Sequence, residues 1–536
     1  MAMVLAASEM IGTALAATDS DSPEQTATSD RGIYQVTIRP RNDTVPVGEL
    51  HEWVIRPQTA AGAGFVPTEL VFMAGMPGHG HGTTSEPRVT EYLTDGSFLV
   101  EGVKFNMTGL WNIIVSVTGP AGPDRVVFEL TVRNRPVDVP NAPTDWSEDE
   151  LRALASLWLG SLGPVPNDPS NRLSGDPRAA SLGQALFFDR RLSKGNDISC
   201  ATCHDPKLLF TDGRPRSFGS RETARHSPGL LGVAYSKWQY WDGRRDSLWA
   251  QAVTPIETPG EMDSARVDVV RYVLTGDGYR EPFGELSESL STADMLDAKR
   301  FPEGAGPYAS DEGRAAWSRM AAADQERINR AYSDIGKMLA AYVETLRVSP
   351  GRFDQFSEAM LGGQSDRATD ILSKDEIAGL RLFIDADRTP CLRCHNGPLF
   401  TSHEFHNVGT GMAADESVDF GRWVGLRAAL LDEFNCRGRF SDASEKQCDE
   451  LGYATDTDTE LGAFKVPGLR NVAETAPYMH DGRFTGLHDV LQHYRNPPNT
   501  DEMPSEILPF ELNDQEAAQI VAFLSTLTGV ASGADQ

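Results

Sequence analysis

Two short motifs hold the residues best suited to chemistry. Each has two cysteines separated by two residues and followed directly by a histidine: Cys200-Ala-Thr-Cys203-His204 and Cys391-Leu-Arg-Cys394-His395. This pattern is typical of c-type heme attachment, in which two thiols add to the heme vinyl groups and the histidine binds the iron. A shared zinc site and a thioredoxin-like dithiol are the alternatives, but the pairs lie far apart and no βαβ pattern surrounds them. The motifs therefore predict two covalently bound heme c groups.

The two remaining cysteines, Cys436 and Cys448, lie in one loop-like acidic stretch. Heme c is attached outside the cytoplasm, where disulfides also form, so the motifs predict a periplasmic or secreted protein. One disulfide between Cys436 and Cys448 would leave no cysteine unassigned, and two free thiols are the alternative.

Composition and charge exclude several classes of protein. The chain has 536 residues, of which 40% are hydrophobic and 24% charged, and its formal net charge is −28. This length and composition suit several globular cores. The acidic balance argues against nucleic-acid binding, while it would attract a basic protein partner. No run approaches the roughly 18 apolar residues of a membrane span.

The chain divides into segments of different texture. Residues 1–30 read as a signal-like or disordered segment: the start is apolar, but it has no basic residue before Arg31. Either reading excludes these residues from the fold. Residues 31–134 show short alternating runs that predict an all-β, immunoglobulin-like sandwich, and the proline-rich stretch 135–146 reads as a linker. Helical patterns follow, which predict two mainly α-helical cytochrome c-type heme domains over 147–360 and 361–536.

Local signals place individual elements. Strands are expected at 33–38, 51–55, 111–117 and 126–132, and a long helix near 324–346. The stretches 302–313 and 410–460 read as loops. Capping boxes predict three helix starts, at Ser147-x-x-Glu150, Ser373-x-x-Glu376 and Asn513-x-x-Glu516.

Further motifs follow in order around the two cysteine pairs. They are the stretches 182–193, 210–213, 227–228, 240–248, 397–400, 405–407, 464–471, 475–482 and 488–494. Together they resemble the bacterial di-heme cytochrome c peroxidase family, which includes the MauG-like enzymes, over about residues 147–530. The resemblance implies an oxidoreductase that uses peroxide, with a peroxidatic heme at the first motif and an electron-transfer heme at the second. His204 and His395 would then be the proximal iron ligands.

The resemblance implies roles for three residues near the first heme. Gln251 and Glu261 match the family's distal pair. Glu261 suits acid–base chemistry, since peroxide must lose a proton to bind iron and the departing oxygen must gain one. Taken alone, Glu261 would be an ordinary loop residue. Trp241 matches the tryptophan that relays electrons between the hemes, and a packing role is the alternative.

The sixth ligand of the second heme separates the subfamilies. The resemblance places this ligand on Tyr494, as in MauG-like enzymes, where ordinary peroxidases use methionine. Met479 and His480 are nearby competitors, and Tyr494 could also be a packing residue. The family's distal histidine on the first heme corresponds here to Ser220, which implies a peroxide site that is open without prior reduction.

The family's calcium site is matched only in part. Thr475 and Pro477 are present, but His226 stands where the family has an asparagine. Calcium prefers oxygen ligands, so calcium here would need water to compensate for the histidine.

The amino-terminal domain resembles small β-sandwich domains of the YtkA/FixH type. It contains a cluster of methionines and histidines, namely Met73, Met76, His79 and His81, with Met107 further on. Thioether and imidazole ligands together suit copper. Core methionines beside a glycine-rich turn, or a docking module, are the alternatives.

Three hypotheses for function follow. The first is a peroxidase that reduces hydrogen peroxide to water with electrons from a small cytochrome c or cupredoxin. The second is a MauG-like enzyme that uses peroxide to oxidise Trp or Tyr residues of a partner protein. The third is a non-enzymatic electron-transfer or copper-handling protein, against which Glu261 and Gln251 argue, because a carrier needs no acid or base at an open iron.

Overall fold

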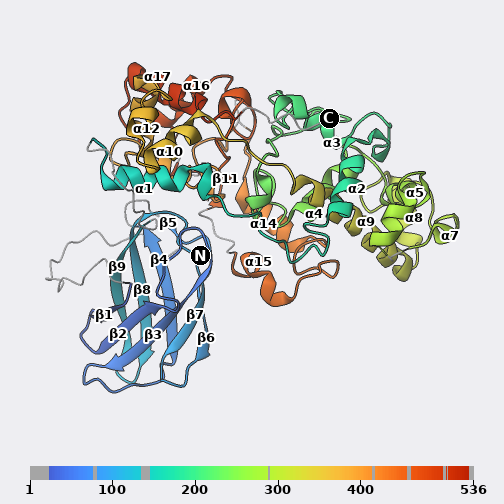
Figure 1. The fold of residues 1–536 in the computed structure, drawn as a ribbon. Coiled ribbons are helices and arrows are strands. Elements are labelled where there is room, and N and C mark those ends of the chain that lie inside the picture. The colour runs from blue at the N-terminus through green and yellow to red at the C-terminus, as the bar shows by residue number, and fades with distance from the viewer. Residues whose placement is uncertain are drawn as a thin grey trace. The chain divides into compact units, whose positions relative to one another are not determined.

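The computed structural model divides the chain into two compact units, residues 1–133 and 134–536 (Figure 1). The structure describes residues 23–529 except 77–80, 134–144, 288–289, 413–416, 455–459, 499–502 and 504. The predicted linker therefore lies largely outside the described residues. Its last two residues, Asp145 and Trp146, are described, and Trp146 packs into a core of the second unit.

The first unit is an antiparallel β-sandwich, as the sequence predicted. One sheet has the order β1-β2-β3-β7-β6 and the other β5-β4-β8-β9. Strands of the first sheet are β1 (Gln25–Thr28), β2 (Tyr34–Pro40), β3 (His51–Thr59), β6 (Arg88–Tyr92) and β7 (Phe98–Val103). Strands of the second are β4 (Glu69–Met76), β5 (His81–Gly82), β8 (Gly109–Gly119) and β9 (Gly122–Val132).

Alternating side chains from both sheets meet in the sandwich core. In β8, every second residue from Trp111 to Val117 is buried, and the partners in between are partly exposed. Trp53 of one sheet approaches Phe72 of the other, with ring centroids 6.1 Å apart. The domain also begins earlier than expected: β1 lies inside the excluded segment 1–30. Its polar residues are ordered by ladder bonds to β2, a tertiary effect that no local pattern announces.

The second unit is mainly helical, again as predicted. Its helices are α1 (Glu148–Leu157), α2 (Pro177–Phe188), α3 (Cys200–Cys203), α4 (Leu248–Glu257), α5 (Arg266–Thr275), α6 (Arg280–Leu286), α7 (Thr292–Met295), α8 (Asp311–Arg319), α9 (Ala322–Val343), α10 (Arg352–Leu361), α11 (Ser365–Ala368), α12 (Lys374–Ile384), α13 (Cys391–Cys394), α14 (Arg422–Leu431), α15 (Asp449–Tyr453), α16 (Leu487–Arg495) and α17 (Asp514–Ser525). A short ribbon joins β10 (Phe405–His406) to β11 (Phe464–Lys465).

All three predicted capping boxes are present, at the starts of α1, α12 and α17. The predicted long helix is α9. The stretches predicted as loops are partly helical instead, since α14 and α15 lie within 410–460 and α8 begins inside 302–313. Surrounding glycines and aspartates hid these helices, while tertiary packing supports them: Leu426 and Ala429 of α14 are buried.

The helices gather into two hydrophobic clusters, one around each cysteine motif. The first contains residues of α2, α4, α5 and α9, and the second residues of α10, α12 and α17. Close backbone contact tightens each cluster. A methyl group on Gly183 of α2 would lie 1.9 Å from the carbonyl oxygen of Met338, so only glycine lets α2 approach α9 this closely.

Packing in these clusters crosses the predicted boundary at residue 360. Leu151, Leu154 and Leu157 of α1 belong to the second cluster, although α1 precedes the first motif. Conversely, Phe434 and Phe440 from the carboxyl-terminal part belong to the first cluster. The division into two heme domains stays a prediction, and each hydrophobic cluster contains residues from both sides of the predicted boundary.

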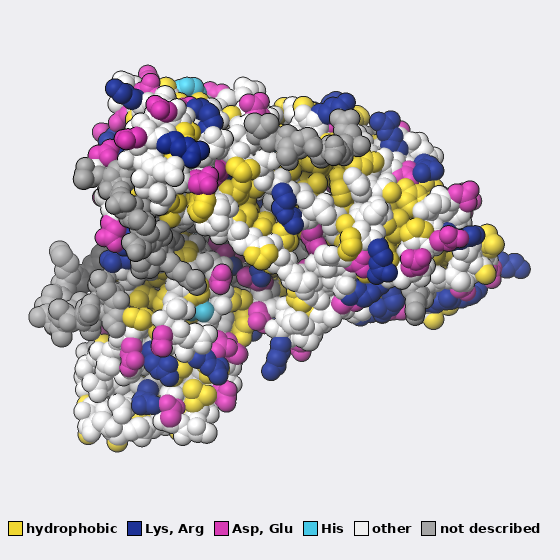
Figure 2. All heavy atoms as spheres, in the orientation of Figure 1, with side chains coloured by type: hydrophobic (Ala, Val, Ile, Leu, Met, Phe, Trp, Pro, Cys, Tyr) yellow, Lys and Arg dark blue, Asp and Glu magenta, His cyan; other side chains and the backbone are white. Residues whose placement is uncertain are grey.

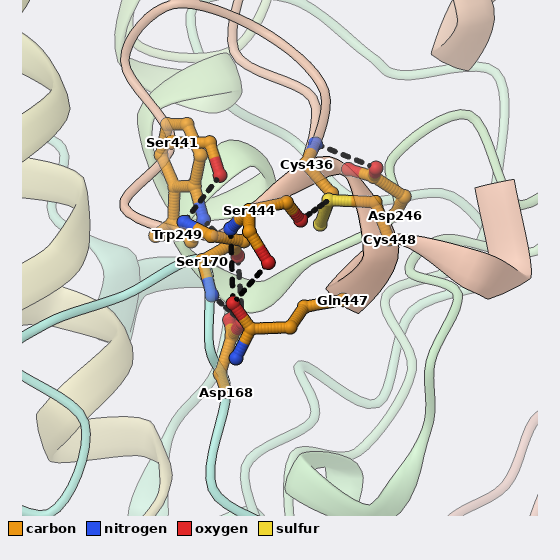
Figure 3. Close-up of a disulfide and its surroundings, with 10 residues drawn as sticks. Asp168, Ser170, Asp246, Trp249, Cys436, Ser441, Ser444, Gln447 and Cys448 are labelled. Carbon is orange, nitrogen blue, oxygen red and sulfur yellow. Dashed lines mark hydrogen bonds between the residues drawn. A yellow bond between two sulfur atoms is a disulfide. The ribbon is translucent and has the colours of Figure 1, made fainter. Parts of the chain in front are cut away.

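Phe440 belongs to a loop that is closed by a disulfide. Cys436 and Cys448 are bridged, which confirms the predicted disulfide. The main-chain N–H of Cys436 donates to Asp246 at 2.8 Å, just before α4, so the bridge lies against the first cluster (Figure 3). Nearby, Trp249 of α4 donates its ring N–H to the hydroxyl of Ser170 at 2.8 Å.

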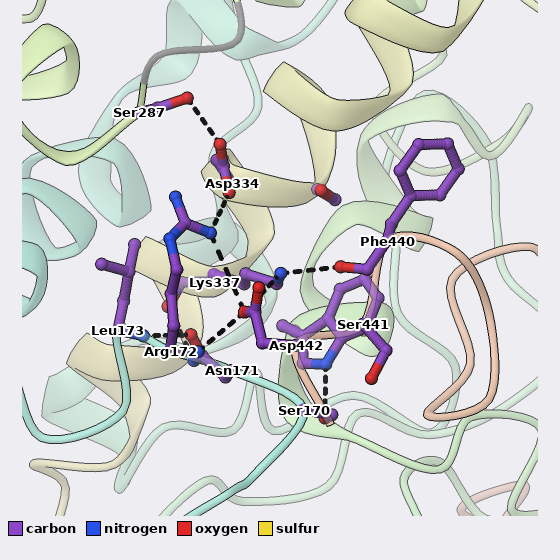
Figure 4. A network of polar contacts seen from close by, with 12 residues as sticks. Ser170, Asn171, Arg172, Leu173, Ser287, Asp334, Lys337, Phe440, Ser441 and Asp442 are labelled. Atoms are coloured by element: carbon purple, nitrogen blue, oxygen red, sulfur yellow. Dashed lines mark hydrogen bonds and ion pairs between the residues drawn. The ribbon is translucent and has the colours of Figure 1, made fainter. Parts of the chain in front are cut away.

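Buried polar contacts hold the same loop in place (Figure 4). Lys337 of α9 donates to the carbonyl oxygen of Phe440 and to Asp442, each at 2.7 Å. Arg172 donates its main-chain N–H to Asp442 at 2.8 Å, and its guanidinium pairs with Asp334 of α9 at 2.6 Å. Because a buried ammonium group without partners would be costly, these bonds fix the loop to α9 specifically.

In the part of the chain that the structure covers, every helix is too short or too polar to cross a bilayer.

Candidate active site

The first cysteine motif presents its histidine in a form that can bind a metal. Cys200 and Cys203 begin and end α3, and both are free thiols. The ring Nδ1 of His204 lies 2.9 Å from the carbonyl oxygen of Phe210. Because a carbonyl can only accept, Nδ1 carries the proton and Nε2 keeps its lone pair. Burial lowers the pKa of His204, which keeps the ring neutral.

The second motif repeats this arrangement. Cys391 and Cys394 begin and end α13 and are free thiols. Nδ1 of His395 lies 3.1 Å from the carbonyl oxygen of Phe400, and burial lowers the pKa of His395 to about 4. Each motif thus offers two unbridged thiols and a neutral imidazole with a fixed tautomer, a donor set that fits covalently bound heme c.

Glu261 lies in a tight loop after α4, and a second loop is bonded to it. The main-chain N–H of Ser220 donates to the carbonyl oxygen of Glu261 at 2.8 Å, and that of Arg221 to Gly260 at 3.0 Å. A methyl group on Gly219 would lie 2.6 Å from both carbonyl oxygens. The close approach of the two loops therefore requires glycine at 219.

The charge of Glu261 acts on the first motif. Burial raises the pKa of the Glu261 carboxyl, and the nearby guanidinium of Arg244 lowers it in part. Burial also raises the pKa of the Cys203 thiol to about 12, and the charges of Asp212 and Glu261 add to that rise. The structure thus brings Glu261 and Cys203 into one electrostatic neighbourhood, where a carboxyl with a raised pKa can exchange protons near neutral pH.

Gln251 of α4 faces the same neighbourhood, together with two residues that sequence reasoning did not identify. Tyr240 and Arg244 lie in the loop 239–245, which the backbone bond from Gln239 to Arg245 closes at 2.8 Å. The guanidinium carbon of Arg244 lies 3.4 Å from the ring centroid of Tyr240. Their position in the same short motif as Trp241 was the available signal.

Trp241 is bonded to both parts of the helical unit. Its buried indole N–H donates to the carbonyl oxygen of His226 at 2.9 Å, and its own carbonyl oxygen accepts from the N–H of Lys465 at 2.7 Å. Arg225 and Asp419 form a further ion pair at 2.7 Å between the same parts. This position suits an electron relay, and that role stays a prediction.

Tyr494 of α16 lies near the second motif. Burial raises the pKa of its phenol, and the thiols of Cys394 and Cys391 contribute to the rise. The ring of the competitor His480 stacks on Phe464, with centroids 3.7 Å apart, and its Nε2 lies 3.7 Å from Asp419. Iron ligation by Tyr494 stays a prediction, with a location that suits it.

The remaining metal predictions receive less support. Nδ1 of His226 lies 2.7 Å from the carbonyl oxygen of Arg214, so this side chain is held by a backbone bond. Thr475 ends the short 3-10 helix Val472–Glu474, and Pro477 forms a cis peptide bond with Ala476. Calcium at this place stays a prediction.

The proposed copper residues do not all meet. Met73 and Met76 lie on opposite faces of β4: Met73 is 48% exposed, whereas Met76 is 5% exposed and packs in the sandwich core. Two ligands of one ion cannot point to opposite faces of a strand, so this pair does not form a site. His79 and the side chain of His81 lie outside the described residues. No cluster of three or more His, Cys, Asp or Glu residues suited to a metal occurs among the described ones.

Two thiol–imidazole motifs, with the partly buried Glu261 near the first, fit the class of di-heme c-type peroxidases. A family model described as di-haem cytochrome c peroxidase matches residues 177–361. The methylamine utilization protein MauG of Methylorubrum extorquens is 30% identical over 389 residues, which are 72% of this chain and 87% of that protein. The cytochrome c551 peroxidase of Nitrosomonas europaea is 30% identical over 353 residues, 65% of this chain and 80% of that protein.

Among solved structures, a MauG-like protein associated with microbial copper homeostasis is 23% identical, with a TM-score of 0.47; the match covers 69% of this chain and 93% of that one. The chain belongs to the di-haem cytochrome c peroxidase and MauG family. It is accordingly an oxidoreductase with peroxide as electron acceptor, and membership implies two heme c groups.

Proposed function

We propose that this protein reduces hydrogen peroxide to water in the periplasm, with electrons from a small cytochrome c or cupredoxin. The observation that carries the proposal is the position of Glu261, a partly buried residue whose loop is held by backbone bonds and whose charge acts on the first motif. When bound there, the heme supplies the iron at which peroxide reacts.

The chain supplies the proton chemistry. In its ionised form, Glu261 accepts the proton that peroxide loses, and it returns this proton to the departing oxygen. Gln251 offers an amide that can orient the peroxide. Ser220 uses its backbone to hold the Glu261 loop, and it brings no imidazole to compete with peroxide. We infer that the resting protein needs no prior reduction.

The surface charge suits a basic donor. The formal net charge is −28, and on the face drawn in Figure 2 acidic side chains are spread among basic ones. A basic donor would therefore be attracted by the net charge of the whole protein more than by one local acidic patch. The rate of association with the donor should fall as salt is raised.

A second candidate function rests on Tyr494. A phenolate is a hard anionic donor that favours oxidised iron, so a second heme with this ligand could share an oxidising equivalent. That property suits a MauG-like enzyme, which would use peroxide to oxidise Trp or Tyr residues of a partner protein.

Peroxide turnover by the as-isolated ferric protein, with reduced cytochrome c as donor and no pre-reduction, tests the proposal. Fast donor oxidation is expected for a peroxidase with an open resting site. Negligible turnover, together with a heme spectrum that still shifts with peroxide, would refute donor-driven peroxide reduction and favour the MauG-like function.

A further inference from the structure

Tyr240 combines several features that packing alone does not explain. Its backbone has a φ of +68°, a left-handed conformation that is strained for a bulky side chain. Its hydroxyl is buried, and the polar side chain that acts on it is that of Gln251; it forms no well-aligned hydrogen bond with any other described residue. A structural tyrosine normally satisfies its hydroxyl, as Tyr332 does by donating to the carbonyl oxygen of Val253 at 2.7 Å.

The neighbours of Tyr240 are those of the peroxide site. Arg244 stacks on its ring at 3.4 Å and is also the main charge acting on Glu261. Burial raises the pKa of Tyr240 to about 12; the charge of Glu261 adds to the rise, and Gln251 opposes it. The phenol therefore keeps its proton at neutral pH, with a carboxylate close by.

We propose that Tyr240 is a redox-active catalytic residue that lends one electron to the reduction of peroxide while its phenol proton is held by Glu261; over the full cycle the donor supplies both electrons and the solvent both protons. This rests on the proposed function. Reduction of peroxide to two waters takes two electrons and two protons. The phenol O–H bond of Tyr240 breaks: the electron goes to the oxidising equivalent left by peroxide, and the proton goes to the Glu261 carboxylate. Tyr240 is then a neutral phenoxyl radical, and an electron arriving through Trp241, with the proton from Glu261, restores the phenol.

Arg244 explains why the electron and proton must leave together. A positive charge 3.4 Å from the ring opposes removal of an electron alone, because a tyrosine radical cation would lie against a cation. Loss of the proton to Glu261 leaves a neutral radical and removes that repulsion. The same guanidinium favours the ionised, proton-accepting form of Glu261.

Electron paramagnetic resonance of the diheme protein, frozen within milliseconds of adding hydrogen peroxide without donor, tests this assignment. A tyrosyl signal is expected whose hyperfine splitting narrows when the protein contains ring-deuterated tyrosine. Tyr240→Phe should lower this signal at least tenfold, and the fold should be kept because phenylalanine retains the ring on which Arg244 stacks. Tyr332→Phe is the matched control, since Tyr332 is also buried beneath a guanidinium, with Arg266 5.0 Å from its ring centroid.

Three results would overturn the assignment: a tyrosyl signal that persists in Tyr240→Phe, an equal loss in Tyr332→Phe, or peroxide consumption by the parent without any tyrosyl signal. The proposed function survives each of them. If peroxide neither shifts the heme spectrum nor is consumed, the proposed function fails as well, and the two failures are thereby distinguished.

Discussion

Replacement of Glu261 by glutamine tests the acid–base chemistry most directly. The amide has nearly the shape of the carboxyl, but it neither accepts nor returns a proton at accessible pH. The backbone bonds from Ser220 and Arg221 use main-chain carbonyl oxygens, so the loop should keep its position. Both hemes should remain attached, because the change touches neither cysteine motif.

The expected loss follows from the role. A positioned acid–base group contributes about 10²- to 10⁴-fold to a rate. At 1.36 kcal/mol per factor of ten, this corresponds to about 3–5 kcal/mol of barrier height. We expect the second-order rate constant for peroxide to fall within that range.

The pH dependence gives a second, independent signature. Burial raises the pKa of Glu261 above its ordinary value of 4.5, and the carboxylate is the proton-accepting form. The parent rate should therefore rise with pH through an inflection above 4.5 and then level off. The Glu261→Gln protein should lack this inflection.

Stopped-flow absorbance at the heme Soret band, at several pH values, measures both quantities. Glu222→Gln is the matched control, because Glu222 is an exposed carboxylate of the neighbouring loop and its loss removes the same charge. A parental rate in Glu261→Gln, or an inflection that persists in it, would show that Glu261 is not the acid–base group.

Three further predictions concern the surroundings of the site. Tyr494→Phe should change the spin state of the second heme, measured by electron paramagnetic resonance. An unchanged spectrum would show that Tyr494 is not a ligand of the iron. Gly219→Ala should lower the peroxide rate constant by about tenfold or more, since its methyl would lie 2.6 Å from carbonyl oxygens of the Glu261 loop. Ser220→Ala is the control and should react at the parental rate, because only the backbone of Ser220 bonds to that loop. Equal rates in the two variants would contradict this prediction. Serine at both bridged cysteines should lower the free energy of unfolding by about 3 kcal/mol, measured by urea titration, because the loop between them spans 12 residues; unchanged stability would contradict it.

Sequence patterns predicted those elements and motifs that depend only on residues close together in the chain. The capping boxes at Ser147, Ser373 and Asn513 each use a side chain to satisfy nearby N–H groups, so they can be read without knowing the fold. The alternation in β8 and the two heme-binding motifs are equally local. Helix α14 and strand β1 were not predicted, because residues distant in sequence stabilise them.

The same distinction applies to the site. Resemblance supplied Glu261, Gln251 and Trp241, whose locations the structure now describes. Tyr240 and Arg244 could not be singled out from the sequence, because the evidence for them is a backbone angle and a 3.4 Å stacking distance, which no residue pattern contains. For the copper residues, the local pattern does not contain the strand geometry that places Met73 and Met76 on opposite faces of β4, and copper binding stays a prediction.

The disulfide-closed loop has a consequence for the order of folding. The first cluster needs Phe434 and Phe440, and the buried ammonium of Lys337 finds its partners only at Phe440 and Asp442. A chain made from its amino terminus therefore cannot complete the core around Cys200 and Cys203 until more than 200 further residues have followed. We expect the first cysteine pair to stay accessible during that interval, which gives the attachment machinery time to act before the core closes.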